Sequence, residues 1–216
     1  MYDLPQPWLI DVHRRTLKDV KLPQIRVDQY PSYVYDIIMQ STWPYKTTPE
    51  YYHARDRAMM SLTFLSCGRI NETLRVTKQQ VDLEGDADFV VVRNFYVSKR
   101  KESTLKRYGL TIIDVPMPKN ETALLYPFTK LVLDYLPNIE NAEDRSFNIG
   151  TNRAFQIIRY CTGLWCHWFR SLGLSFYVNT LKNPIAVAKI FGVQNVNTIM
   201  HYFKGTWLDY RDQLSK

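Results

Sequence analysis

Five side chains along the sequence have the types and spacing needed for chemistry at a phosphate group. His167 and Arg170 stand three residues apart, so a helix would place them on one face. Arg69 lies in the other half of the chain, and its planar guanidinium could hold the same phosphate as Arg170 from a second side. Lys99 could give a proton to a departing oxygen, and His167 could accept one from the attacking group. Tyr202, near the end of the chain, could attack phosphorus.

Each of these residues, taken singly, also has a structural explanation. Arg69 could be a solvated arginine near a helix end, and His167 could be a structural histidine. Lys99 is one of several lysines in a basic segment, where general attraction of phosphate is the alternative. Tyr202 is one of 15 tyrosines, and most tyrosines pack with the hydroxyl at the surface. The combination, rather than any one residue, indicates a site for phosphoryl transfer.

The elements that would position these residues are mostly helices. Hydrophobic periodicity and start and stop signals predict helices over 31–40, 48–68, 71–77, 122–136, 151–160, 166–177, 184–191 and 196–203. The β-branched runs at 89–92 and 111–115 predict a hairpin with a basic tip at 98–108, its second strand ended by Pro116 and Pro118. The sequence therefore predicts a mainly α domain with a small antiparallel β-sheet, an α+β fold.

Composition and charge favour a soluble protein with an anionic partner. The chain has 216 residues, 45% hydrophobic and 23% charged, which suits one domain with a core. Its net charge of +7 makes nucleic acid the first candidate partner. Cys67, Cys161 and Cys166 form no CxxC pair, which predicts reduced, buried thiols. With no signal peptide and no apolar run near the roughly 20 residues of a membrane span, we expect a cytoplasmic protein without membrane contact.

The order Arg, Lys, His-x-x-Arg, Tyr resembles the catalytic series of the tyrosine recombinases, the phage integrase family that includes Cre- and Xer-type enzymes. The segment Ser66-Cys67-Gly68-Arg69-Ile70-Asn71-Glu72 is similar to the family's Thr-Gly-x-Arg-x-x-Glu, and Ala54-Arg55-Asp56-Arg57-Ala58-Met59 resembles the helix that precedes it. Lys99 precedes Asp114-Val115-Pro116-Met117, which is similar to the family's Val-Pro-Leu run. His167 and Arg170 match the family's His-x-x-Arg, and Tyr202 follows Gly192 at the family's distance.

The resemblance implies a recombinase or integrase that cuts and rejoins double-stranded DNA through a 3′-phosphotyrosyl intermediate. It implies the tyrosine-recombinase catalytic-domain fold, with an N-terminal arm or linker at 1–21, the catalytic domain at 22–205 and a tail at 206–216 that could dock on a neighbouring copy in a synaptic tetramer. No cofactor and no metal are expected, since arginines supply the positive charge and the sequence has no Walker motif and no metal-ligand cluster.

The same resemblance assigns roles to individual residues. The catalytic residues would be Arg69, Lys99, His167, Arg170 and Tyr202, and the supporting ones Glu72 and His201. The DNA-contacting residues would be Arg93, Arg100, Lys101, Lys106 and Arg107, which gather in one basic segment. The richness in tyrosine and isoleucine would suit an archaeal virus or plasmid integrase.

Two departures from the family pattern keep other functions open. Val193 stands where the family has a histidine or tryptophan, and a valine donates no hydrogen bond to phosphate. Arg170 is followed by Ser171-Leu172-Gly173 instead of His-Thr. One alternative is therefore a catalytically impaired DNA-binding relative of the same fold, and another is a relaxase similar to type IB topoisomerases.

Overall fold

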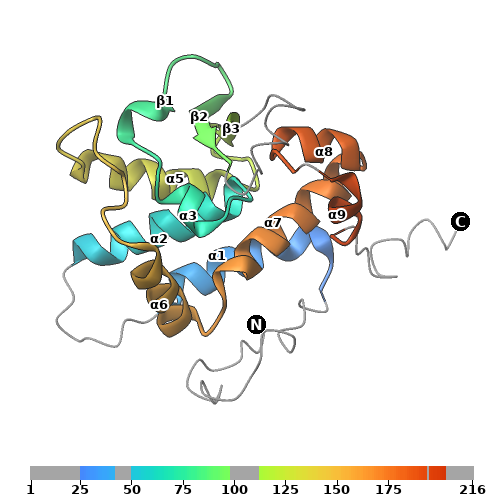
Figure 1. Ribbon diagram of the computed structural model, residues 1–216, viewed down its shortest axis with the longest axis horizontal. Coiled ribbons are helices and arrows are strands. Elements are labelled where there is room, and N and C mark those ends of the chain that lie inside the picture. Colours follow the sequence, from blue (N-terminus) through green and yellow to red (C-terminus); the bar gives the residue numbers. More distant parts are fainter. Residues whose placement is uncertain (1–24, 42–49, 98–111, 194, 203–216) are drawn as a thin grey trace, which may run out of the picture.

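The computed structural model describes residues 25–41, 50–97, 112–193 and 195–202, which form helices packed around a small sheet (Figure 1). The α-helices are α1 Tyr30–Met39, α2 Glu50–Leu65, α3 Ile70–Thr73, α5 Tyr126–Tyr135, α6 Thr151–Thr162, α7 Cys166–Leu181, α8 Pro184–Ile190 and α9 Val196–Met200. Short 3₁₀ turns occupy Val27–Gln29, Lys78–Gln80 and Leu136–Asn138. Within these ranges no helix has the length and apolar character needed to cross a membrane. The predicted mainly α fold with a small antiparallel sheet is confirmed.

Helix α2 forms the centre of the fold, where it packs against α1, α5 and α7 (Figure 1). The predicted buried stripe of Ala58, Leu62 and Leu65 is at most 1% exposed. Met59 and Phe64, on other sides of the helix, are also fully buried. The second half of α2 is thus buried on all sides, as expected for a helix that runs into a core. The turn that follows α2 therefore begins at the end of a helix that the core holds in place.

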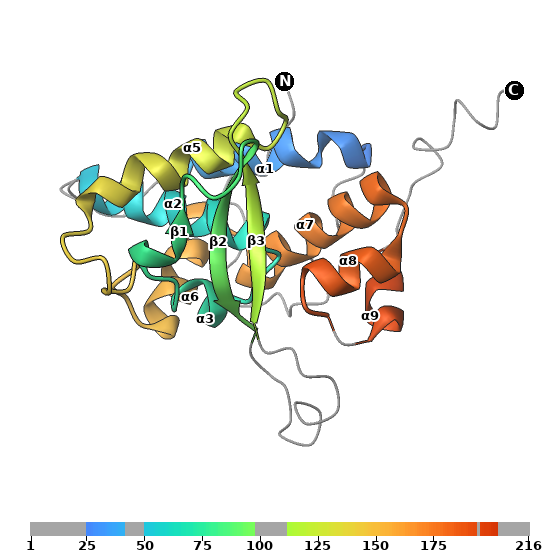
Figure 2. The same ribbon diagram turned by 90° about the horizontal axis from the view of Figure 1, so that it is seen from above.

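The sheet consists, in the described part of the chain, of β1 Val81–Asp82, β2 Phe89–Tyr96 and β3 Ile112–Pro118, antiparallel and in that order (Figure 2). The antiparallel pairing of the two β-branched runs is confirmed. The predicted strand end was wrong, because Pro116 pairs with Val91 and Pro118 pairs with Phe89. Strand β3 is at the sheet edge, where a missing N–H breaks no ladder hydrogen bond. The basic tip lies outside the described residues.

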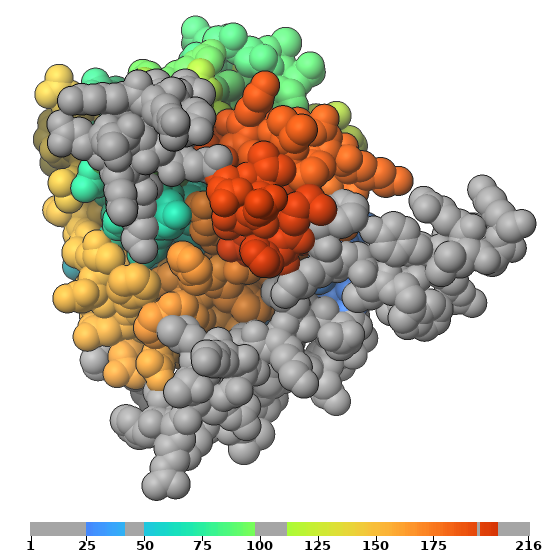
Figure 3. Space-filling model, turned by 45° about the vertical axis from the view of Figure 1, so that its right-hand side comes forward, coloured from blue at the N-terminus to red at the C-terminus, as the bar shows by residue number. Residues whose placement is uncertain are grey.

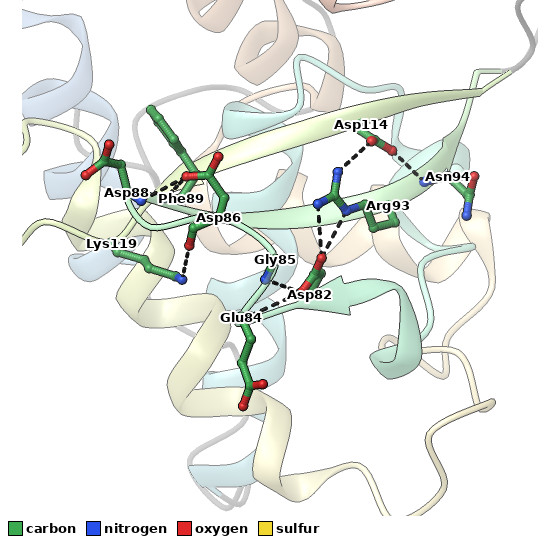
Figure 4. Close-up of polar contacts among 10 residues, drawn as sticks. All are labelled: Asp82, Glu84, Gly85, Asp86, Asp88, Phe89, Arg93, Asn94, Asp114 and Lys119. Carbon is green, nitrogen blue, oxygen red and sulfur yellow. Dashed lines mark hydrogen bonds and ion pairs between the residues drawn. The ribbon is translucent and has the colours of Figure 1, made fainter.

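A bulge in β2 brings Arg93 between the carboxylates of its two neighbouring strands. The pairing register shifts between Val92 and Phe95, and Asn94 has a φ of 54°. The Arg93 guanidinium lies 3.0 Å from Asp82 on β1 and 2.9 Å from Asp114 on β3 (Figure 4). The charge of Arg93 is thus paired on both sides within the sheet, and its contact with DNA stays a prediction.

Two helices are shorter than predicted, for local reasons. Helix α3 ends at Thr73, because Val76 and Thr77 turn toward the 139–150 segment: Ser146 N–H donates to the Val76 carbonyl at 2.7 Å. Helix α5 begins only at Tyr126, after a turn in which the Asn120 side chain accepts the N–H of Thr122 at 2.9 Å. The four predicted helices from Thr151 onward are confirmed, with the last one described as far as Met200.

A second, smaller apolar cluster lies at the C-terminal end of the fold. Its buried members, called the C-terminal cluster below, are Cys67, Leu174, Val178, Val187, Ala188, Phe191 and Ile199. Helix α7 belongs to both apolar regions, since its first half packs into the main core and its second half into this cluster. Helix α8 packs on α7, and α9 packs on α8, to one side of the sheet (Figure 2).

The predicted reduced, buried thiols are confirmed at all three cysteines. Burial raises the pKa of Cys161 and of Cys166 to about 12, and it raises the pKa of Cys67 as well. A thiol with a raised pKa is a poor nucleophile at neutral pH, so these side chains act as small apolar groups.

Candidate active site

The turn after α2 fixes the position of Arg69 at the start of α3. Glu72, three residues later, accepts the backbone N–H of Arg69 at 2.6 Å with one carboxylate oxygen. Its other oxygen accepts the Arg69 guanidinium at 2.8 Å. The Glu72 side chain is only 1% exposed, whereas that of Arg69 is 26% exposed. One buried carboxylate thus caps the helix and holds the arginine, whose side chain still reaches solvent.

Helix α7 brings Arg170 to the same carboxylate from the other half of the chain. The guanidinium of Arg170 is buried, donates a hydrogen bond to the carbonyl of Cys67 and lies 3.8 Å from Glu72 Oε2. Burial lowers the pKa of Arg170, and the nearby charge of Arg69 lowers it further, while Glu72 opposes both. An arginine keeps its charge despite such shifts. Two guanidinium groups from distant parts of the chain therefore share one carboxylate.

Tyr202 lies near the C-terminal end of the described residues. It is the second residue after α9, is half-buried and packs against the C-terminal cluster. Its backbone N–H donates to the Ile199 carbonyl at 2.8 Å. The phenol is a minor influence on the pKa of Arg170, where it opposes the lowering caused by burial. Figure 3 shows the residues around α3 (teal) and helices α8 and α9 (red) on one face of the molecule.

His167 lies in the first turn of α7, and the motif places it one turn before Arg170. Its residue is exposed, whereas Arg170 is buried, so the two neighbours occupy the surface and the interior of the same helix end. The His167 carbonyl accepts the Ser171 hydroxyl at 2.9 Å.

The remaining predicted residues fall into two groups. Lys99, Arg100, Lys101, Lys106 and Arg107 lie outside the described residues. Val193 is half-buried, packs on the C-terminal cluster beside Tyr202 and donates its N–H to the Ala188 carbonyl at 2.8 Å. His201 is exposed immediately after α9. Their roles stay predictions.

Sequence patterns did not predict one partner in this group, the main-chain carbonyl of Cys67. Sequence motifs describe side chains, whereas the main-chain carbonyl of a cysteine has the same chemistry as that of every other residue. The one available signal was the position of Cys67 between a helix end and Gly68, where the chain has to turn sharply.

Comparison with known proteins gives a fold but no sequence relative. No protein-family model matches the sequence, and no curated protein matches it. The XerH site-specific recombinase bound to palindromic difH, a post-cleavage complex, matches with a TM-score of 0.53 and 16% identity over 92% of this chain and 56% of that chain. The same recombinase bound to difH before cleavage matches with a TM-score of 0.52 and 15% identity over 87% of this chain and 52% of that chain.

The fold is that of a tyrosine recombinase catalytic domain. This chain spans about half the length of the XerH chains that it matches. Identity at this level shows a shared fold, so the chemistry has to be argued from the residues of this chain.

Proposed function

We propose that this chain is the catalytic domain of a tyrosine recombinase, which cuts and rejoins DNA strands through a covalent link to Tyr202. The observation that carries the proposal is the meeting of Arg69 and Arg170 on the single carboxylate of Glu72. The planar forks of two arginines match the oxygens of a phosphate diester, so two guanidinium groups held at one point suit this anion.

The proposed reaction uses the residues in the following order. A DNA phosphate binds between the guanidinium groups of Arg69 and Arg170, which offset the charge that develops on its non-bridging oxygens. The hydroxyl of Tyr202 attacks phosphorus and gives its proton to His167. The bond from phosphorus to the 5′ oxygen breaks, and that oxygen takes a proton from Lys99. The 3′-phosphotyrosyl link keeps the phosphodiester bond energy, so the reverse reaction rejoins the strand.

The proposed substrate is double-stranded DNA, as in the two XerH complexes. We assign the catalytic domain to residues 22–205 and grip on the DNA to the basic residues Arg100, Lys101, Lys106 and Arg107. Contacts of this kind with phosphates make affinity fall steeply as salt rises. Residues 1–21 would serve as an arm, and 206–216 would dock on a neighbouring copy in a synaptic tetramer.

The test is capture of the covalent intermediate from DNA of unspecified sequence. The chain is incubated with a pool of randomised duplexes nicked near each candidate scissile phosphate, so that a short fragment leaves after cleavage and rejoining is blocked. Adducts that survive denaturing electrophoresis are then isolated and sequenced. We expect an adduct with the wild-type chain and none with Tyr202→Phe. Tyr160→Phe is the matched control, because Tyr160 lies on α6 and is 58% exposed.

The two alternatives give different results in the same assay. A catalytically impaired DNA-binding relative, which Val193 would suit, retains duplexes from the pool but forms no adduct. A relaxase forms the adduct and also relaxes supercoiled plasmid as a monomer, without synapsis of two sites. Tight retention without adduct would therefore contradict the proposed chemistry, whereas monomeric relaxation would contradict only the assignment as a recombinase.

A further inference from the structure

Gly173 lies on α7 one turn after Arg170, where that helix crosses the end of α2. A Cβ at this position would stand 2.6 Å from the Phe64 carbonyl oxygen and 2.9 Å from the Cys67 sulfur. The Phe64 oxygen belongs to the main chain and accepts the Cys67 N–H at 3.2 Å, so it cannot swing aside. Close approach of the two helices, rather than backbone conformation, is what requires glycine here.

Cys67 forms the other side of this contact. It is fully buried and has a φ of 47°, a left-handed conformation that non-glycine residues rarely adopt and that surrounding packing has to maintain. In this conformation its carbonyl accepts a hydrogen bond from the guanidinium of Arg170. The next residue is also fixed, since the Gly68 N–H donates to the Ser66 hydroxyl at 3.0 Å.

We propose that Gly173 and the Cys67 carbonyl position Arg170 for strand cleavage, so that Gly173 is a positioning residue of the site. This inference rests on the proposed function. The carbonyl is a neutral acceptor, so it orients the guanidinium without consuming its charge, unlike the carboxylate of Glu72. A methyl group at position 173 would push α7 off α2. Arg170 would then lose the carbonyl and its alignment with Arg69 over the phosphate.

The test compares Gly173→Ala with Gly150→Ala, a control at a position where an added Cβ has no atom within 4 Å. Each variant and the wild-type chain cleave the duplex recovered from the adduct pool, under single-turnover conditions. Gly173→Ala should cleave about 100-fold more slowly, the effect of misplacing a reacting group by roughly 1 Å. DNA affinity, which comes from many phosphate contacts, should stay within about twofold of wild type. Gly150→Ala should match wild type in both measurements.

A second substrate separates positioning from general damage. In this duplex a methylphosphonate replaces the scissile phosphate, so the group carries no negative charge and needs less help from arginine. The ratio of wild-type to Gly173→Ala rates should therefore be at least about tenfold smaller on the methylphosphonate than on the phosphate. A damaged fold or a misplaced Tyr202 would slow both substrates alike, and that result would overturn the inference.

A double variant covers the case in which Gly173→Ala folds poorly. Cys67→Gly suits the left-handed conformation, keeps the carbonyl and removes the sulfur, one of the two atoms that an alanine at 173 would meet. The double variant Cys67→Gly, Gly173→Ala should therefore cleave faster than Gly173→Ala alone, or show the same substrate dependence if the single variant does not fold. Absence of adduct with wild-type chain would defeat the proposed function itself. Wild-type activity in Gly173→Ala would defeat only this inference.

Discussion

Two clusters of arginines and carboxylates in this molecule have opposite balances of charge. In the sheet, the partly exposed guanidinium of Arg93 lies between the carboxylates of Asp82 and Asp114. At the end of α2 two guanidinium groups share the buried carboxylate of Glu72. In the first cluster carboxylates outnumber guanidinium groups, whereas in the second the two guanidinium groups outnumber the carboxylate that they share. The second arrangement is the one that suits a phosphate, because two arginines can hold its oxygens together.

The largest expected difference between the two clusters follows from removing one arginine from each. Arg170→Ala should lower the cleavage rate by about 10³-fold or more, because a preorganised positive group at the reacting phosphate is lost. Arg93→Ala should leave cleavage within about twofold of wild type, since its charge acts inside the sheet. Single-turnover cleavage and filter binding measure the two effects. Parallel loss of DNA affinity and cleavage in Arg170→Ala would argue for a binding role instead.

A second prediction tests how the guanidinium groups of Arg69 and Arg170 depend on the carboxylate of Glu72 that they share. In Glu72→Gln the amide oxygen can still accept the Arg69 N–H, but two guanidinium groups are left to repel each other. The free energy of unfolding should fall by about 3 kcal/mol, as when one partner of a buried ion pair is removed. Urea denaturation measures this change, and sulfate at matched ionic strength should stabilise the variant more than the wild-type chain.

Asp114→Asn is the control for that experiment, because its side chain is 49% exposed and belongs to the other cluster. We expect a small change in stability and no response specific to sulfate. Equal responses of the two variants to sulfate would remove the distinction between the clusters.

The smallest expected effect is the loss, in acid, of the stability that Asp82 contributes to the sheet. The N–H groups of Gly85 and Glu84, followed by the guanidinium of Arg93, lower the pKa of Asp82 in the folded chain. A lowered folded-state pKa gives stability that is fully present above the unfolded value of about 3.9 and is lost as pH falls through the folded value. Wild type should therefore exceed Asp82→Asn in stability at about pH 6 and lose that advantage at about pH 2.5. The midpoints of urea unfolding at the two pH values measure this difference. A wild-type advantage that grows as the pH falls would contradict the prediction.

Sequence patterns predicted the regular elements and the meeting of distant residues to different degrees. Helical periodicity located α2 and the four helices from Thr151 onward, because burial on one face leaves a readable repeat. The motif series also grouped Arg69 with Arg170, and both lie at Glu72 in the structure. Side-chain patterns carry no information about the Cys67 carbonyl or the contact at Gly173, since both depend on how closely two helices approach.

Two other features depend on tertiary context in the same way. The pairing of Arg93 with Asp82 was not predicted, because Asp82 lies in a strand that the sequence did not predict. Pro116 looked like a strand end, because the place of β3 at the sheet edge becomes known only when the strand order is known. Predictions from short sequence patterns fail where the neighbour that determines the structure lies far away in the sequence.

The prolines of β3 also affect how copies of this chain could crowd together. In the proposed synaptic tetramer several copies would gather on one stretch of duplex. An open sheet edge is a template for strand pairing between copies. Pro116 and Pro118 have no amide hydrogens to offer an incoming strand, so each sheet in such an assembly would stay separate.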